Sequence, residues 1–204
     1  MEAVARKGRR ADPQKDEAIL DAAKELFLER GYGVAIDDIA AAAGVSKQTI
    51  YARYACKHDL LAAVVHRVAE SLVSTLLVGA AAAEDALARF GERFVDVVFD
   101  PRRMALQRLV IAQSAQFPEL ARLYYESGPS FVREKLASYI KAEASAGRLA
   151  VADAHEAAAN FLGLILGADH LPALMGLLTP PCAEDRRLRV KSAVNAFLKL
   201  YKKN

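Results

Sequence analysis

The chain has 204 residues with a formal net charge of +3, and 53% of its residues are apolar. This length is enough for one domain or two small ones with a buried core, and the composition excludes a disordered chain. Alanine and leucine are abundant, 7% of the residues are aromatic and none is tryptophan. We therefore expect an all-α fold, because alanine and leucine are strong helix formers.

The net charge does not by itself indicate a nucleic-acid partner, because phosphate contacts are local. Residues 1–60 contain equal numbers of acidic and basic residues, but the two kinds are unevenly distributed. Basic residues gather in residues 1–12 and between Gly44 and His58, whereas residues 13–30 are rich in acids. We expect residues 1–12 to be a flexible basic arm that follows phosphates or enters a minor groove. A solvated tail is the alternative.

Neither cysteine, Cys56 or Cys182, has a partner at a spacing typical of a metal site, so we expect two free thiols in a reducing compartment. The first ten residues lack the apolar stretch of a signal peptide. The most apolar window, residues 157–168, is shorter than the roughly 20 residues that a bilayer span needs. We expect a cytoplasmic protein with no membrane association, no cofactor and no metal.

Apolar periodicity and helix-breaking residues predict about nine helices and no strand. The first runs from Pro13 to Arg30 and ends at Gly31. A bend is expected near Gly128 and Pro129, because proline removes a backbone donor, and a kink is expected at Pro172. The predicted helices cover residues 13–30, 36–43, 47–54, 57–78, 84–99, 102–115, 119–146, 152–178 and 184–201.

The stretch from Ile36 to Lys57 predicts two short helices joined by a turn at Gly44, Val45 and Ser46. Gly44 suits the left-handed residue that ends a helix, and Ser46 is a preferred N-cap. This arrangement is typical of a helix-turn-helix, which presents its second helix to the DNA major groove. The alternative is an ordinary antiparallel helix pair with solvated charges.

Three motifs in the first sixty residues resemble the DNA-binding region of the TetR/AcrR family of transcriptional regulators. They read IxxxAxxLFxxxGY from Ile19, IAxxAGVSxxTIYxxY from Ile39 and KxxLL from Lys57. The resemblance implies a three-helix DNA-binding domain in residues 13–58 and a helical effector-binding and dimerisation domain in residues 59–204. One departure is Ala35, where that family usually has a Ser or Thr that caps the next helix.

The second predicted helix of the motif carries polar side chains that we expect to face DNA. By the resemblance and by their positions at helix starts or on an exposed face, we expect Ser46, Tyr51 and Lys57 to contact phosphate. The side chains expected to reach base edges are Lys47, Gln48, Thr49 and Arg53, because such cations, amides and methyl groups match guanine, adenine and thymine.

The last two predicted helices are too apolar to face water on all sides, which indicates burial on more than one face. A monomer core could absorb them, but a four-helix bundle between two copies explains them more economically, and the resemblance implies the same. The residues expected at this dimer interface are Phe161, Leu164, Ile165, Val190, Val194 and Phe197. The residues expected to line an effector cavity between the middle helices are Phe94, Gln113, Phe117, Tyr124, Tyr125 and Phe131.

These features predict a homodimeric regulator, by resemblance a repressor, that a small apolar or amphipathic effector releases from a near-palindromic operator. One alternative is a helix-turn-helix protein without an effector, in which the helical core would be filled. A helical enzyme is the other alternative. The sequence has no Glu-x-x-His pair, no Gly-flanked nucleophilic serine and no phosphate-binding glycine loop, so we expect no enzyme.

Overall fold

The computed structural model describes residues 12–77 and 82–202, and its elements are helical throughout, as predicted. The helices are α1 (Pro13–Arg30), α2 (Ile36–Ala42), α3 (Lys47–Tyr51), α4 (Lys57–Val73), α5 (Ala83–Val98), α6 (Pro101–Gln113), α7 (Pro118–Tyr125), α8 (Phe131–Ser145), α9 (Ala154–Leu166), α10 (His170–Leu174) and α11 (Ala183–Tyr201). None of these helices combines the length and apolar character that crossing a membrane requires. The predicted basic arm lies outside the described residues except for Asp12.

Capping side chains account for the start of several helices. The side chains of Asp12, Ser46, Asp100 and Asp153 accept hydrogen bonds from backbone N–H groups in the first turns of α1, α3, α6 and α9. These N–H groups have no partner inside their own helix, so each cap stabilises a helix end. The predicted helix starts therefore agree with the structure to within a few residues.

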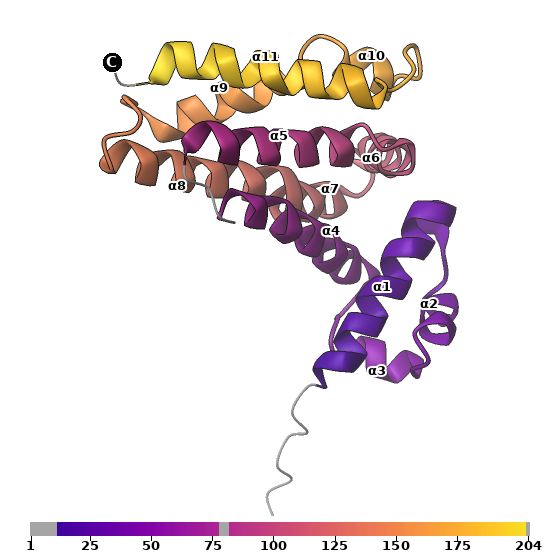
Figure 1. Ribbon diagram of the computed structural model, residues 1–204. Coiled ribbons are helices and arrows are strands. Elements are labelled where there is room, and N and C mark those ends of the chain that lie inside the picture. Colours follow the sequence, from indigo (N-terminus) through magenta and orange to yellow (C-terminus); the bar gives the residue numbers. More distant parts are fainter. Residues whose placement is uncertain (1–11, 78–81, 203–204) are drawn as a thin grey trace, which may run out of the picture.

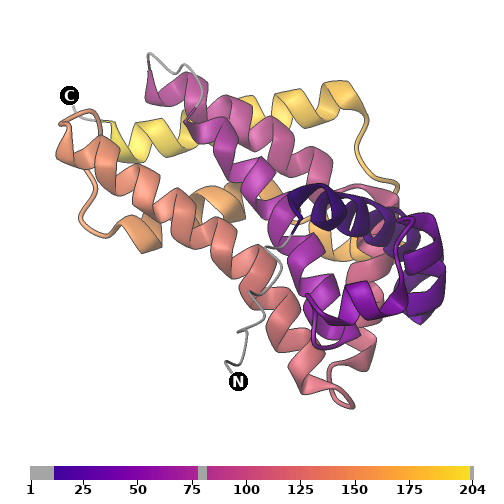
Figure 2. The ribbon, with the colours of Figure 1, turned by 90° about the horizontal axis from the view of Figure 1, so that it is seen from below.

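Two hydrophobic cores form along the chain, and α4 contributes to both. Leu60, Leu61 and Val64, in the first half of α4, are buried with residues of α1, α2 and α3. Ala69 and Leu72, in its second half, are buried with residues of α5, α8, α9 and α11. Figure 1 shows the first three helices grouped at one corner, with α4 leading from them into the larger bundle. The same path of α4 beside α8 is visible in Figure 2.

The predicted helix over residues 119–146 is divided at the expected place. Residues Glu126–Ser130 form a π-helical turn between α7 and α8, and Pro129 lies inside it. A wider turn accommodates the missing proline donor, so the chain stays helical through the bend.

The predicted kink at Pro172 is wrong, because the chain leaves the helix earlier. Helix α9 ends at Leu166, and Gly167 has a left-handed φ of 57°. Arg189 of α11 donates to the carbonyl oxygen of Leu166 at 3.1 Å and also pairs with Asp169. The left-handed Gly167 ends the helix, and this guanidinium satisfies a carbonyl that the helix end leaves without a partner. Pro172 lies in the first turn of α10, where no N–H is needed.

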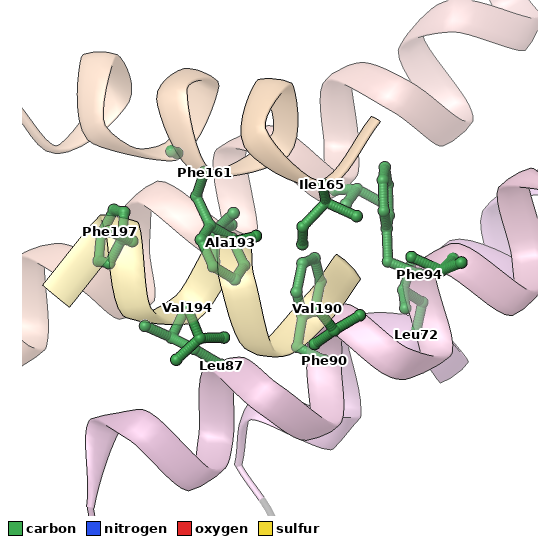
Figure 3. Close-up of a cluster of buried hydrophobic side chains, with 14 of the residues drawn as sticks. Leu72, Leu87, Phe90, Phe94, Phe161, Ile165, Val190, Ala193, Val194 and Phe197 are labelled. Atoms are coloured by element: carbon green, nitrogen blue, oxygen red, sulfur yellow. The ribbon is translucent and has the colours of Figure 1, made fainter. Parts of the chain in front are cut away.

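Five of the six predicted dimer-interface residues are instead inside the protomer. Figure 3 shows them packed between α5, α9 and α11, and at most 3% of each residue is exposed. They are Phe161, Ile165, Val190, Val194 and Phe197. These side chains cannot contact a second chain, because the three helices of one chain already cover them. Leu164, on the other face of α9, is 39% exposed.

A close approach between the π-helical turn and α4 generates a prediction about stability. A Cβ atom added at Gly128 would lie 2.7 Å from the Cγ1 atom of Val65. Because that atom belongs to a stiff β-branched side chain, Gly128→Ala should lower the free energy of unfolding by about 1–3 kcal/mol. Urea denaturation measures the change. Gly33→Ala is the control, since no atom lies within 4 Å of its added Cβ. Equal stabilities of the two variants would contradict the prediction.

Candidate functional site

The helix-turn-helix predicted between Ile36 and Lys57 is present as α2, a turn and α3. Gly44 has a φ of 64°, and the N–H of Val45 donates to the carbonyl oxygen of Ala40 at 3.0 Å, which closes the turn. The hydroxyl of Ser46 accepts from the N–H of Thr49 at 3.1 Å. Ile50 is buried against the first core, so the opposite face of α3 is turned outward.

The outward face of α3 carries three exposed predicted DNA contacts. The side chains of Lys47, Gln48 and Tyr51 are exposed, and Tyr51 is 46% exposed. The Nζ atom of Lys47 donates to the Oδ2 atom of Asp37 on α2 at 3.0 Å. Thr49 is half-buried, and its hydroxyl lies 2.9 Å from that of Ser46. The side chains available for contact without breaking an ion pair are therefore Gln48 and Tyr51.

Arg53 differs from the prediction that it reads a base edge. Only 17% of its side chain is exposed, and its Nε atom lies 3.5 Å from the Oδ1 atom of Asp16 on α1. The same carboxylate oxygen accepts a hydrogen bond from the hydroxyl of Tyr54 at 2.9 Å. Burial and this hydrogen bond raise the pKa of Tyr54. Asp16 therefore holds the segment after α3 against α1, a role that sequence reasoning missed.

Lys57 is the first residue of α4, which follows α3 in the chain. Its Nζ atom lies 4.5 Å from the ring centroid of Tyr32, and within the described residues no carboxylate pairs with it. Burial lowers the pKa of Lys57 and raises that of Tyr32 to about 12. An unpaired cation beside the N–H groups of a helix start favours an anionic partner such as phosphate.

The acids near this surface are also paired. Asp38 lies 3.7 Å from Arg30, and Ala35 provides no side-chain hydrogen bond to the start of α2. The capping contact that Ser or Thr would supply at position 35 is therefore missing, as the sequence indicates. Asp37 and Asp38 lie in the first turn of α2, where the helix dipole favours negative charge.

A cavity of about 280 Å³ lies between the two hydrophobic cores. Its walls are mostly aliphatic side chains of α4, α5, α8 and α9, and it also contacts Lys24 and Leu28 of α1. Of the six predicted cavity residues, Phe94 and Tyr124 line it, whereas Gln113, Phe117, Tyr125 and Phe131 do not. Phe117 and Tyr125 are exposed, and Phe131 packs edge-on against His66.

Three further polar residues line the cavity and were not predicted: Arg103, Gln107 and His170. Burial lowers the pKa of the Arg103 guanidinium and of the His170 imidazole, and raises the pKa of the Tyr124 hydroxyl. The Nε2 atom of His170 is buried without a hydrogen-bond partner. The spacing of Arg103 and Gln107, four residues apart on one helix, is the sequence signal that would have grouped them.

A helix-turn-helix joined by one long helix to a helical bundle is an arrangement typical of DNA-binding transcriptional regulators. Residues 19–64 match the family described as bacterial regulatory proteins of the tetR family. Residues 85–203 match the C-terminal domain of AefR-like transcriptional repressors. The chain therefore belongs to the TetR family of transcriptional regulators, and this family does not consist of enzymes.

Related proteins agree with this assignment. A protein of Mesorhizobium loti MAFF303099 assigned to the TetR family has 28% identity and a TM-score of 0.78, with 96% of this chain and all of that chain covered. The flavonoid-responsive regulator FrrA has 32% identity and a TM-score of 0.67, covering 95% of this chain and all of that chain. The transcriptional activator FasR of Mycolicibacterium smegmatis is 46% identical over 57 residues, which span 28% of this chain and 26% of FasR.

Two tyrosines, one bonded to Asp16 and one exposed, provide a matched test of the interface. Tyr54→Phe removes the hydrogen bond to Asp16 and should lower the free energy of unfolding by about 1 kcal/mol. Tyr51→Phe should leave stability unchanged and weaken DNA binding, because its hydroxyl faces outward. Urea denaturation and a DNA titration measure the two effects. If Tyr51→Phe destabilised the protein more than Tyr54→Phe, the assigned roles would be wrong.

Proposed function

We propose that the protein is a cytoplasmic repressor that binds a near-palindromic operator as a homodimer and is released by a small-molecule effector. The observation that carries the proposal is the outward face of α3, where Gln48 and Tyr51 are exposed beside Lys47, together with Lys57 of α4, which has no carboxylate partner among the described residues. The match of residues 85–203 to AefR-like repressors supports repression. FasR is an activator, but its match covers only 28% of this chain and 26% of FasR, so it carries little weight for the direction of regulation.

The polar side chains of α3 divide into two kinds of contact. Gln48 presents an amide that matches the donor and acceptor of adenine in the major groove, and Lys47 matches the acceptors of guanine. Ser46 is the N-cap of α3, Tyr51 is its last residue and Lys57 is the first residue of α4, and these positions suit phosphates. The methyl group of Thr49 suits thymine instead. The pair between Lys47 and Asp37 is solvent-exposed, and such pairs contribute little to stability, so Lys47 can exchange its partner for DNA at small cost.

The proposed dimer interface is the outer face of α9 and α11, opposite the residues buried in the protomer. Leu164 of α9 lines one surface groove together with Leu188, Ser192 and Ala196 of α11. Leu188 and Leu200 are 60% and 67% exposed. Two such faces from two copies would form a four-helix bundle that covers them. A dimer would also double the recognition helix and match two half-sites.

The proposed effector site is the cavity, because it contacts helices that also hold α3. Val64, Val65 and Val68 of α4 and Leu28 of α1 line it, and both helices belong to the core of the DNA-binding domain. An effector that binds one setting of α4 better than the other would shift the population toward that setting. DNA affinity would then fall by the difference between the two binding free energies.

The experiment that tests the proposed function is selection of duplexes from a random pool by the purified protein, followed by sequencing. We expect enriched sequences with two-fold symmetry and half-sites about one helical turn, or a multiple of it, apart. Enrichment of no sequence, or of sequences without any symmetry, would overturn the proposal.

Lys57 and Gln48 should differ in how they affect DNA binding. Lys57→Ala should weaken binding to all duplexes alike and reduce the slope of log affinity against log salt by about one unit, because one phosphate contact is lost. Gln48→Ala should change which sequence is preferred. Fluorescence anisotropy on matched and mismatched duplexes measures both, with Lys141→Ala on α8 as a charge control. If both variants lost the same affinity for every duplex, Lys57 and Gln48 would not have these separate roles.

A charge placed on the outer face of α9 should separate the dimer. Leu164→Glu should raise the dimer dissociation constant at least about tenfold, or 1.4 kcal/mol, because it buries a carboxylate in the proposed interface. Sedimentation velocity measures the dissociation constant. Ile111→Glu is the control, since Ile111 is 53% exposed on α6, away from this face. If Leu164→Glu raised the dimer dissociation constant no more than Ile111→Glu does, this face would not be the dimer interface.

A further inference from the structure

The polar residues of the cavity are unusual in their charge, because none of them is an acid. The lining residues include two cations, Lys24 and Arg103, and neither an aspartate nor a glutamate. Lys24 has a carboxylate partner, Glu25, 3.3 Å away on its own helix. Arg103 is different, because no carboxylate in the described part of the chain pairs with its guanidinium. The carboxylate of Asp100 accepts the backbone N–H of Arg103 as the cap of α6.

Three residues that carry hydrogen-bond donors line the cavity from two adjacent helices, α6 and α7. Arg103 and Gln107 are separated by one turn of α6, so their side chains leave the same face of that helix. Tyr124 lines the same cavity from α7, which packs against α6. Among residues 12–77 and 82–202, neither the Arg103 guanidinium nor the Tyr124 hydroxyl has a hydrogen-bond partner, although both are partly buried. Partly buried donors of this kind favour an anionic acceptor.

The other lining residues indicate what kind of molecule could carry the anionic group. They are largely Val, Leu, Ala and Phe, from α4, α5, α8 and α9. His170 adds no charge near neutral pH, because burial lowers its pKa below the ordinary value of 6.5. At an interior packing density of about 0.75, a 280 Å³ cavity holds on the order of ten to fifteen non-hydrogen atoms. One anionic group with an apolar body of this size fits the lining.

We propose that the effector is an amphipathic monocarboxylate whose carboxylate binds Arg103, with Gln107 and Tyr124 as further donors. This inference rests on the proposed effector function and names the chemical class that the cavity accepts. A guanidinium binds a carboxylate through two parallel N–H···O bonds, and the amide and phenol supply single bonds. A phosphate ester is a poorer match, because a dianion would require a second unpaired cation and the walls are apolar.

Two probes with the same ten-carbon skeleton, one with an anionic and one with a neutral head group, test the proposal by calorimetric titration of the full chain. Decanoate should bind, and 1-decanol, which has the same apolar chain, should bind at least tenfold more weakly. Arg103→Gln should lower the affinity for decanoate at least tenfold and leave that for 1-decanol within twofold. Arg102→Gln is the matched control, because the Arg102 guanidinium pairs with Glu25 rather than facing the cavity.

A second variant keeps the test decisive if Arg103→Gln does not fold. Tyr124→Phe removes the hydroxyl donor and keeps the aromatic ring. It should lower the affinity for decanoate several-fold without changing the affinity for 1-decanol. Failure of decanoate to bind, equal binding of the two probes, or insensitivity of decanoate to both variants would overturn the proposal. Release of operator DNA by 1-decanol alone would leave the effector function standing while refuting the anionic class. Failure to bind any operator would refute the repressor function itself.

Discussion

The burial of one helix in two separate cores is the constraint on which the rest of this structure depends. Leu60, Leu61 and Val64 fix the start of α4 in the DNA-binding domain, and Ala69 and Leu72 fix its end in the larger bundle. A packed α-helix behaves as a nearly rigid rod, so α4 cannot tilt at one end without moving the other. The cavity lies against the middle of α4, where a guest contacts both domains.

Within residues 12–77 and 82–202, the proposed DNA-binding surface combines one cation without a carboxylate partner with two that have local partners. The Nζ atom of Lys57, at the start of α4, lies over the ring of Tyr32. Lys47 pairs with Asp37, and Arg53 pairs with Asp16. The two pairs differ in exposure: the pair with Asp37 is open to water, and the Arg53 side chain is largely buried. Exposed ion pairs exchange partners at little cost, whereas a partly buried pair keeps the two segments that it joins together. Charge alone therefore does not identify the residues that meet DNA.

The sequence predicted the fold class and most helix boundaries, because capping residues and glycines act locally. The break at Gly167 was not predicted, although a glycine is a local signal for a helix end; the guanidinium of Arg189, which satisfies a carbonyl at this end of α9, comes from a different helix. The interface prediction failed for a related reason. Apolar residues on α9 and α11 are compatible with a protomer core or a dimer, and only packing against α5 decides that Phe161 and Phe197 are internal.

The candidate site was predictable to a similar extent. The motif from Gly44 to Lys57 identified an outward helix, but the carboxylate of Asp16 that holds Arg53 lies more than thirty residues earlier. For the cavity, the sequence predicted apolar walls with a few polar groups, and of the six predicted residues Phe94 and Tyr124 line it. Arg103 was overlooked, since a charged residue on a helix is usually solvated and its position facing a cavity depends on α7 and α10.

The central claim is that α3, held by α1 and carried by α4, reads duplex DNA as one of a symmetric pair. Hydroxyl-radical footprinting of a bound operator tests this most directly, because it reports which faces of the duplex are covered. We predict two protected segments on the same face of the duplex, related by two-fold symmetry and separated by about one helical turn or a multiple of it. A single asymmetric protected segment, or protection spread evenly around the duplex, would contradict the account.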